Sequence, residues 1–538
     1  SGVFIALGRA VVAAVLSIFV HVVAQTYGVS LVTCRFLAIE FDIAVFVGLA
    51  GILVCSFLGG MRAVTWTQVA QYLILIIAYL VPVAILSYKV TGVPVPQAVY
   101  GEVLRDLGVK ELELFSEPRE NEVRLQYRYR ADEYARKIAD LPDALVAERI
   151  GQVERVTELR TQGAPAREIA AAERTLRDLP RTPDEARIKW ERARQDSLSR
   201  SVNPPPHAEA HPGTDQAAKD SARNNFLALT FVLMVGTAAL PHILMRYYTT
   251  PSVREARRSV FWSLFFIFLL YVTAPAYAVF AKWEVYSNLI GTDIGSLPGW
   301  VASWGKVGLV KIEDINGDGI LQLAELTINS DAILLIIPEI AGLPYVVSGL
   351  VAAGGLAAAL STADGLLLTI SHALSHDLYY KMVNPQASTQ RRLVITKSQL
   401  LVVAVVAAWV ASLRPDSILF MVGLAFSIAA SAFFPALVLG IFWKRANKWG
   451  AVAGMLAGLG VTLYYIVRTH PFFGGSMGDA WFDIHPISCG VFGVPLGFMV
   501  IAIVSLLTPP PPLEVQALVD FVRMPDQGRK TLETENRL

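Results

Sequence analysis

Long apolar runs alternate with shorter polar segments along most of this 538-residue chain. A helix that crosses a bilayer needs about 20 apolar residues, and its backbone groups must be hydrogen-bonded within the chain because lipid offers no partners. We count ten runs of that length, at residues 4–32, 40–60, 65–89, 224–246, 259–282, 344–374, 396–413, 417–442, 449–468 and 486–507. The pattern predicts an all-α polytopic membrane protein. A short interfacial helix is expected at 331–341, before the sixth run.

Two polar segments interrupt the apolar runs. Nearly half of all charged residues lie between 101 and 200, where helical periodicity and proline breaks predict helices at 120–140, 143–161, 166–179 and 183–201. The predicted organisation is transmembrane helices at 1–91, a charged helical insert and linker at 92–222, transmembrane helices at 223–283, a polar loop at 284–343, transmembrane helices at 344–507 and a tail at 508–538. The insert is either a solvated helical hairpin without chemistry or a docking or regulatory module.

Composition supports the membrane assignment. Hydrophobic residues make up 54% of the chain and charged residues 17%, against about 25% charged in soluble domains. The net charge of +1 gives no reason to expect a nucleic-acid partner. Three cysteines do not make a disulfide framework, and the motifs of metalloproteases, serine hydrolases and P-loop enzymes do not occur. We therefore expect a membrane protein that is not an enzyme, with the lipid bilayer as its surroundings.

The distribution of basic residues predicts the orientation. Short loops that contain Arg62, Arg246 to Arg258, Lys381 to Lys397 and Lys444 to Lys448 alternate with loops that have few Lys or Arg. Basic loops stay in the cytoplasm, and with ten spans both ends of the chain are then cytoplasmic. The insert, the 284–330 loop and the 469–485 loop are then extracytoplasmic.

The outer loop contains a calcium-binding pattern. Residues 314–325 read DINGDGILQLAE and match D-x-[DN]-x-[DN]-G-x5-E completely. Calcium prefers several oxygen ligands around one point, and Gly319 permits the sharp turn that such loops need. The expected calcium ligands are Asp314, Asn316, Asp318, the carbonyl of Ile320, Gln322 and Glu325. The alternative is a surface turn rich in Asp, Asn and Gly.

The most informative intramembrane segment is 351–380, a run of small residues that contains Ser361, Thr362 and Asp364. Small residues allow helices to approach closely. Because a carboxylate within a span is costly, it marks an ion or proton path by default. Hydroxyl and carboxylate oxygens are hard ligands that suit a small cation. The alternative is that Asp364 is hydrogen-bonded to a neighbouring helix and the two hydroxyls bond their own backbone.

A second signal is the segment GTAALPHILMR at 236–246. A proline within an apolar helix removes a backbone hydrogen bond, and transporters place such breaks at substrate sites. The candidate substrate residues are Thr237, Ala238, Leu240, Pro241 and Gln25. A simple kink is the alternative, and for Gln25 and Gln68 helix packing is the more common role.

These segments resemble a known family. AALSTADGLLLTISHALSHDLY is similar to the eighth core helix of the sodium:solute symporter family, and GTAALPHILMRYYTTPSVREARRSVF to the sixth core helix of its cation/acetate symporter branch. FLGGMRAVTWTQVAQ resembles the start of the fifth core helix, and FMVGLAFSIAASAFFPALVLGIFWKRANKWGAVAGM the tenth core helix and the segment after it. The resemblance covers nearly all of the apolar body. The chain starts with Ser and resembles the family from the third core helix onward, so we expect further N-terminal helices in the native protein.

The resemblance implies a five-plus-five inverted-repeat fold and sodium-coupled uptake by alternating access, in the plasma (inner) membrane of a bacterium. It also implies sodium ligation by Ala358, Ser361 and Thr362, together with carbonyls of a first core helix that this chain does not contain. Some relatives have a carboxylate where Gln68 stands. Asp364 occupies a position where several relatives have a hydroxyl, so it can replace that carboxylate or couple transport to protons.

Three functions are compatible with these observations. The first is sodium-coupled uptake of a small monocarboxylate such as acetate, because the residues near the break are small and apolar. The second is a proton-coupled symporter, or a symporter for another organic solute, on the same fold. The third is a non-transporting membrane sensor, in which the insert and the calcium loop detect a signal and a small membrane protein is the partner. The short C-terminal tail carries no output motif, which disfavours a fused sensor.

Overall fold

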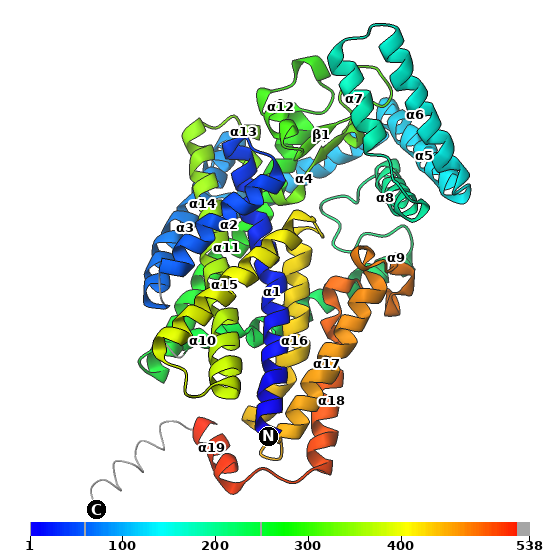
Figure 1. Cartoon of the computed structure of the whole chain (residues 1–538). Helices are drawn as coiled ribbons and strands as arrows, with labels where there is room; N and C mark the ends of the chain where they lie inside the picture. Colours follow the sequence, from blue (N-terminus) through cyan, green and yellow to red (C-terminus); the bar gives the residue numbers. More distant parts are fainter. Residues whose placement is uncertain (1, 59–60, 248–249, 524–538) are drawn as a thin grey trace, which may run out of the picture. The chain divides into compact units, whose positions relative to one another are not determined.

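The structure, a computed structural model, describes residues 2–58, 61–247 and 250–523, and most of these residues are helical (Figure 1). Contacts divide the chain into two compact units. Unit 1 comprises Ser1–Tyr100, Ala210–Ala278 and Asn329–Leu538. Unit 2 comprises Gly101–Glu209 and Val279–Ile328. Helices α4 (Pro96–Ser116) and α11 (Val253–Asn288) each contribute residues to both units.

Unit 1 contains the apolar helices. Its long helices, besides α11, are α1 (Gly2–Leu37), α2 (Phe41–Leu58), α3 (Met61–Thr91), α9 (Gln216–Ala239), α14 (Tyr345–His372), α15 (Thr389–Ser412), α16 (Ile418–Phe442), α17 (Lys448–Thr469) and α18 (Gly490–Leu507). Its shorter helices are α10 (Pro241–Tyr247), α13 (Ile333–Ile340), α19 (Leu513–Arg523) and the 3-10 turns η3 (Ser330–Ala332), η5 (Pro471–Phe473), η6 (Met477–Asp479), η7 (Trp481–Asp483) and η8 (Pro486–Ser488). A π-helical segment, η4 (Ala373–Val383), continues α14.

The prediction of a polytopic helical membrane protein is confirmed. Within the described residues, eight helices are long and apolar enough to cross a membrane, and the bent pair α9 and α10 makes a ninth candidate. The apolar part of α2, Phe41–Val54, is shorter. The predicted ends are less accurate, because α11 and α15 begin six and seven residues before the runs at 259 and 396. Arg and Lys are good helix formers whose long side chains reach away from lipid, so a helix continues where an apolar run stops. Of the predicted tail, residues 524–538 lie outside the described residues.

Helix α14 packs closely against its neighbours. A Cβ atom on Gly354 would collide with the Cβ of Ala78 on α3, and one on Gly355 would lie 3.5 Å from the side chain of Val32 on α1. Small residues in α14 therefore let the two long helices α1 and α3 approach its backbone. This packing holds α14 in a fixed position between them.

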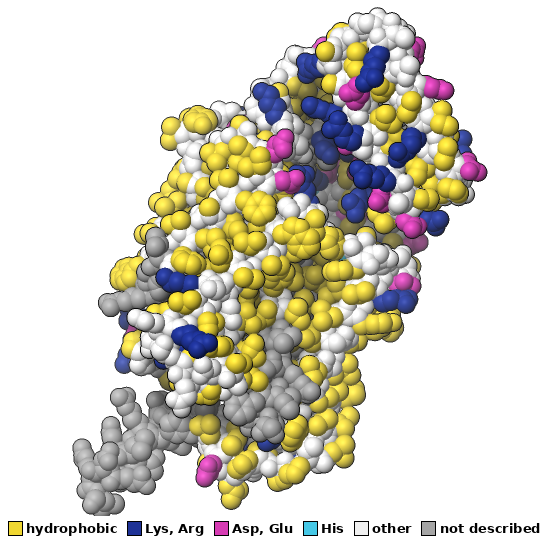
Figure 2. Space-filling view, in the orientation of Figure 1, with side chains coloured by type: hydrophobic (Ala, Val, Ile, Leu, Met, Phe, Trp, Pro, Cys, Tyr) yellow, Lys and Arg dark blue, Asp and Glu magenta, His cyan; other side chains and the backbone are white. Residues whose placement is uncertain are grey.

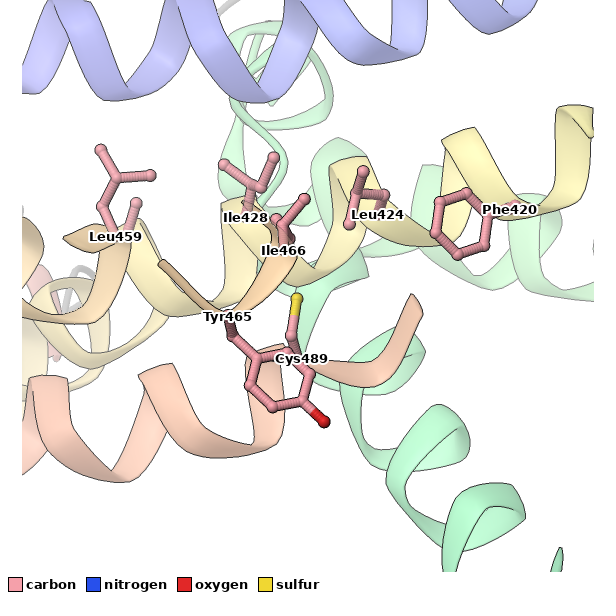
Figure 3. Close-up of a cluster of buried hydrophobic side chains, with 8 residues drawn as sticks. Phe420, Leu424, Ile428, Leu459, Tyr465, Ile466 and Cys489 are labelled. Carbon is pink, nitrogen blue, oxygen red and sulfur yellow. The ribbon is translucent and has the colours of Figure 1, made fainter. Parts of the chain in front are cut away.

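A cluster of buried apolar side chains joins α16, α17 and the start of α18. It contains Phe420, Leu424, Ile428, Ala432, Leu459, Tyr465, Ile466 and Cys489, most of them drawn in Figure 3. The hydroxyl of Tyr465 is buried in this cluster and donates a hydrogen bond of 2.5 Å to the carbonyl oxygen of Ile484. A buried hydroxyl without a partner would cost folding free energy. This hydrogen bond removes that cost, so the tyrosine can be buried among apolar side chains.

Unit 2 contains the charged insert and the loop with the calcium pattern. Its helices, besides parts of α4 and α11, are α5 (Pro118–Ala139), α6 (Asp143–Thr161), α7 (Ala166–Arg177), α8 (Pro183–Ser201) and α12 (Gly299–Lys306), with the 3-10 turns η1 (Ile294–Ser296) and η2 (Leu323–Glu325). It also has two short antiparallel strands, β1 (Val310–Ile312) and β2 (Leu326–Ile328), in which Val310 lies opposite Ile328. The sequence did not predict these strands or most of α4. In Figure 2 the charged side chains gather over the insert helices, whereas the surface of unit 1 is mostly hydrophobic.

A buried ion pair helps to hold the segments of unit 2 together. Glu120 on α5 is 1% exposed and accepts hydrogen bonds from the backbone N–H groups of Leu323 (2.7 Å) and Ala324 (3.1 Å). Its carboxylate also pairs with Arg124 at 2.5 Å, and Arg124 donates to the carbonyl of Arg200 at the end of α8. A buried carboxylate needs such partners because desolvation is costly. Glu120 therefore links α5 to the end of the calcium-pattern loop and, through Arg124, to α8.

Candidate functional site

Three oxygen atoms gather on one turn of α14. The Ser361 hydroxyl donates to the carbonyl oxygen of Ala358 at 2.9 Å, and the Thr362 hydroxyl donates to the same oxygen at 3.2 Å. All three residues are half-buried. The hydroxyls and the carbonyl thus form a group of hard oxygens on one side of the helix, the donor type that small cations prefer. The bonds to Ala358 also have the local pattern that Ser and Thr adopt in helices without a ligand.

Asp364 lies close by on α14 and is fully buried. Its Oδ1 accepts a hydrogen bond of 2.6 Å from the hydroxyl of Ser56 on α2. Its Oδ2 has no hydrogen-bond partner among the residues that the structure describes. A buried carboxylate with a free oxygen atom is costly in an apolar environment, so a cation or a proton at Oδ2 would stabilise it.

The predicted break in the sixth core helix is present. Helix α9 ends at Ala239, Leu240 has extended backbone angles (φ −66°, ψ 117°), and α10 begins at Pro241 with a bend of 42°. The N–H groups of Ile243 and Leu244 both donate to the carbonyl of Leu240 at 3.1 Å, so the first turn of α10 already satisfies them. The break therefore leaves fewer backbone N–H groups available to a ligand than a long unwound segment would.

The structure divides the predicted substrate residues into two groups. Thr237 and Ala238 are exposed, and the Thr237 hydroxyl donates to the carbonyl of Leu233 at 2.6 Å. Leu240 is buried, and Pro241 is half-buried. Thr237 and Ala238 thus lie on the exposed side of α9, whereas Leu240 at the break packs into unit 1.

Helix α1 approaches α10 just after the break. The rings of His21 and His242 meet edge to face with centroids 5.6 Å apart. His21 is buried, and Gln25 is half-buried one turn further along α1. Residues four apart share a helix face, so Gln25 lies on the side of α1 that carries His21. His21 was not selected from the sequence.

Two further contacts at this site were not predicted. Arg246 was assigned to a cytoplasmic loop, yet its guanidinium donates to the side-chain oxygen of Gln68 on α3 at 2.7 Å. The Gln68 side-chain nitrogen in turn donates to the carbonyl of Ser361 at 2.6 Å. Ser56 was not selected either. A serine or glutamine in an apolar run signals only that a polar partner exists, and the partner is set by the tertiary fold.

The calcium-pattern loop has its own internal hydrogen bonds. Asp314 accepts from the N–H groups of Gly317 (2.7 Å) and Gly319 (3.1 Å), and Gly319 has a positive φ of 71°. Glu325 is buried and accepts from the N–H groups of Ile315 (2.8 Å) and Gln322 (3.1 Å). The loop is thereby closed, with its first and last carboxylates bonded to its own backbone.

The remaining loop ligands are Asn316, Asp318, Ile320 and Gln322. The Asn316 side chain accepts from the N–H of Asp318, and Asp318 accepts from the N–H of Ile320 (2.8 Å) and from the Gln322 side chain (2.9 Å). The side-chain oxygen of Gln322 is buried and has no hydrogen-bond partner within the described part of the chain. In that same part, no three His, Cys, Asp or Glu side chains are grouped as a metal site. Calcium ligation would therefore require the Gln322 amide to turn and the carboxylates to converge.

The carboxylates of Asp314, Asp318 and Glu325 repel one another in this loop. Burial raises the pKa of Glu325, two backbone hydrogen bonds lower it, and the negative charges of Asp314 and Asp318 raise it again. A divalent cation would offset these like charges.

Comparisons with known proteins identify the family of this chain. The family model of the sodium:solute symporter family matches residues 4–103 and 313–458. An uncharacterized symporter of Cupriavidus necator is 53% identical over 519 residues, which cover 96% of this chain and 76% of that protein. A monocarboxylic acid transporter of Corynebacterium glutamicum is 28% identical over 296 residues, which cover 54% of this chain and 47% of that protein.

One solved structure is similar over most of the chain. A Na⁺-coupled sialic acid symporter in a substrate-bound, outward-open state covers 93% of this chain and 74% of its own, with 16% sequence identity and a TM-score of 0.44. A likeness at this level carries no information about individual site residues.

The apolar helices are those of a polytopic membrane protein, and the family that its sequence matches consists of transporters and not of enzymes. The chain belongs to the sodium:solute symporter family.

Proposed function

We propose that this protein takes up a small monocarboxylate, such as acetate, together with sodium by alternating access. The observation that carries the proposal is the group of oxygens on α14, formed by the carbonyl of Ala358 and the hydroxyls of Ser361 and Thr362. These oxygens are neutral and lie in a half-buried position, which suits a monovalent cation better than a divalent one. Sodium would be held there, and its gradient would supply the driving force.

Asp364 is the fourth proposed cation ligand. Its Oδ2 has no hydrogen-bond partner among the described residues, and its carboxylate is fully buried. The negative charge would be offset when sodium is bound nearby. Because a proton would satisfy the same oxygen, Asp364 also favours the second candidate, a proton-coupled symporter on the same fold.

The proposed substrate site lies around the break, at Thr237, Ala238, Leu240, Pro241 and Gln25. Small and apolar residues suit a short aliphatic acid, whereas a sugar would need many side-chain donors and acceptors. The monocarboxylic acid transporter of Corynebacterium glutamicum supports this class of solute, although it aligns with only 54% of the chain.

The proposal includes a location and an orientation. The protein would lie in the plasma membrane of a bacterium with its basic loops in the cytoplasm. Both ends of this chain would then be cytoplasmic, and the 92–222 insert and the 284–330 loop extracytoplasmic. A small membrane protein is the proposed partner of the insert.

We also propose that calcium binds the loop at 314–325. The complete motif supports this site. Calcium would take oxygens from Asp314, Asn316, Asp318, Ile320, Gln322 and Glu325. Its role would be structural, because the loop is flanked by short strands and not by the long helices of a sensor.

Radiolabelled uptake into proteoliposomes tests the transport proposal. The full-length protein should accumulate acetate when sodium is high outside, and accumulation should stop when choline replaces sodium. Uptake that responds to a pH gradient and ignores sodium would replace sodium by protons as the coupling ion. The absence of uptake for a panel of short carboxylates would contradict the proposed solute class and favour another solute or a sensor.

A further inference from the structure

Gln68 connects two parts of the site that lie on different helices. Its side-chain oxygen accepts a hydrogen bond from Arg246 on α10, and its side-chain nitrogen donates to the carbonyl of Ser361 on α14. A guanidinium can only donate and a carbonyl can only accept. The Gln68 amide is therefore oriented uniquely, with each end facing the one partner that it can bind.

Arg246 also lies directly against α14. A Cβ atom on Gly365 would be only 2.9 Å from the Nη2 atom of Arg246 and 3.7 Å from the Gln68 side-chain nitrogen. Gly365 is four residues after Ser361, so both residues lie on one face of α14. The guanidinium and the amide thus occupy the same face of α14, and the missing side chain at position 365 gives them room.

The two ends of this bridge have different proposed roles. Arg246 lies on α10, the half-helix that comes after the break at Pro241. Ser361 contributes its hydroxyl to the proposed cation turn, and its carbonyl is the atom that Gln68 holds. A movement of α10 relative to α14 must therefore stretch or break one of the two hydrogen bonds of Gln68.

We propose that Gln68 is a positioning residue that couples the solute half-helix α10 to the cation turn of α14. Cation binding at Ser361 and Thr362 fixes the Ser361 turn, the Gln68 amide then holds Arg246, and α10 is held in the position in which the solute binds. Solute bound beside α10 favours the same arrangement of the cation turn, as reciprocal coupling requires. This inference rests on the proposed sodium-coupled uptake.

The experiment measures how strongly sodium lowers the apparent KM for acetate. The full-length protein is reconstituted in proteoliposomes, and the KM for radiolabelled acetate is determined at low and at saturating sodium. The ratio of the two KM values is the coupling ratio. Allosteric coupling of this kind is typically about 5- to 150-fold.

Two variants test this bridge of hydrogen bonds. Gln68→Leu removes both hydrogen bonds. Gly365→Ala leaves Gln68 intact but pushes the guanidinium away from α14. The matched control is Gln71→Leu, the same change one turn further along α3 at another half-buried glutamine.

We expect Gln68→Leu to lower the coupling ratio at least about fivefold, with Gly365→Ala in the same direction. Vmax at saturating sodium and the thermal stability in detergent should change little, and Gln71→Leu should retain the wild-type ratio. A Gln68→Leu variant with the wild-type ratio would overturn the inference, as would a loss of stability and Vmax with an unchanged ratio. If the wild-type KM does not depend on sodium, the proposed function fails first and the coupling role fails with it.

Discussion

The hydroxyl of Ser56 and the carboxylate of Asp364 are joined by a hydrogen bond of 2.6 Å between α2 and α14. The two residues are 308 positions apart in the sequence, and both are buried. The bond satisfies one carboxylate oxygen and leaves the other for a cation or a proton. Asp364 is thus the group whose replacement separates a structural role from a transport role.

Asp364→Asn should change the cation dependence or the pH profile of uptake. The amide keeps the acceptor for Ser56 but removes the negative charge, so the sodium concentration for half-maximal uptake should rise about tenfold, which corresponds to roughly 1.4 kcal/mol. Uptake is measured over a matrix of sodium concentration and pH. Ser56→Ala serves as the companion variant, because it keeps the charge and removes only the hydrogen bond. If Asp364→Asn has the same sodium and pH dependence as the wild type, Asp364 is structural.

The double variant Ser361→Ala with Thr362→Ala should weaken sodium binding. It removes both hydroxyl oxygens from the turn at Ala358. The hydrogen bonds lost with them are local to α14, so the change should cost little folding free energy. The half-maximal sodium concentration should rise at least about tenfold. Ser371→Ala is the matched control, because its hydroxyl also bonds its own helix, at the Leu367 carbonyl. Equal sodium curves for the double variant and the control would remove the hydroxyl pair from the cation site.

Calcium should raise the thermal stability of the purified protein if the 314–325 loop binds it. The cation binds the folded and not the unfolded chain, and each kcal/mol gained shifts the midpoint by about 2–4 °C for a domain of 150–250 residues. Asp318→Ala should abolish the shift. Because burial and the nearby carboxylates raise the pKa of Glu325, protons compete with calcium and the shift should shrink as the pH falls. Equal shifts in the wild type and in Asp318→Ala would contradict a calcium site in this loop.

Glu120→Gln should destabilise unit 2 strongly. The change leaves Arg124 buried without its carboxylate, and breaking one partner of a buried ion pair costs about 3–5 kcal/mol. Hydrogen exchange of the α5 and α8 amides in the intact protein reports the loss locally. The control is Glu113→Gln, which removes an exposed partner of Lys110 and should cost at most about 1 kcal/mol. Similar exchange rates in both variants would show that the Glu120 and Arg124 pair does not hold these helices.

Proline and glycine made the insert predictable from the sequence. The predicted segment 143–161 coincides with α6, and 183–201 coincides with α8. Each of these helices begins just after a proline or with one, which ends the preceding element and fixes the first turn of the next. Helix α4 was missed because it begins in the boundary between an apolar run and the charged insert, where neither pattern is clear.

The site was predictable only in part. The hydroxyl pair, Asp364 and the break at Pro241 are visible as polar or helix-breaking residues within apolar runs. Their partners are not visible, because Ser56 and Asp364, and likewise Gln68 and Arg246, are brought together by helix packing across 308 and 178 residues. The backbone bonds of Ile243 and Leu244 also depend on how sharply the chain bends at Leu240. These features depend on the tertiary fold and not on local periodicity.

Sodium-driven acetate uptake tests the central claim most directly. The full-length protein is reconstituted in proteoliposomes, and radiolabelled acetate uptake is measured with an inward sodium gradient, with a pH gradient alone, and with neither. Sodium-coupled symport predicts accumulation that requires the sodium gradient and is lost when choline replaces sodium. Accumulation of acetate that is driven by the pH gradient alone, and is the same with and without sodium, would contradict it.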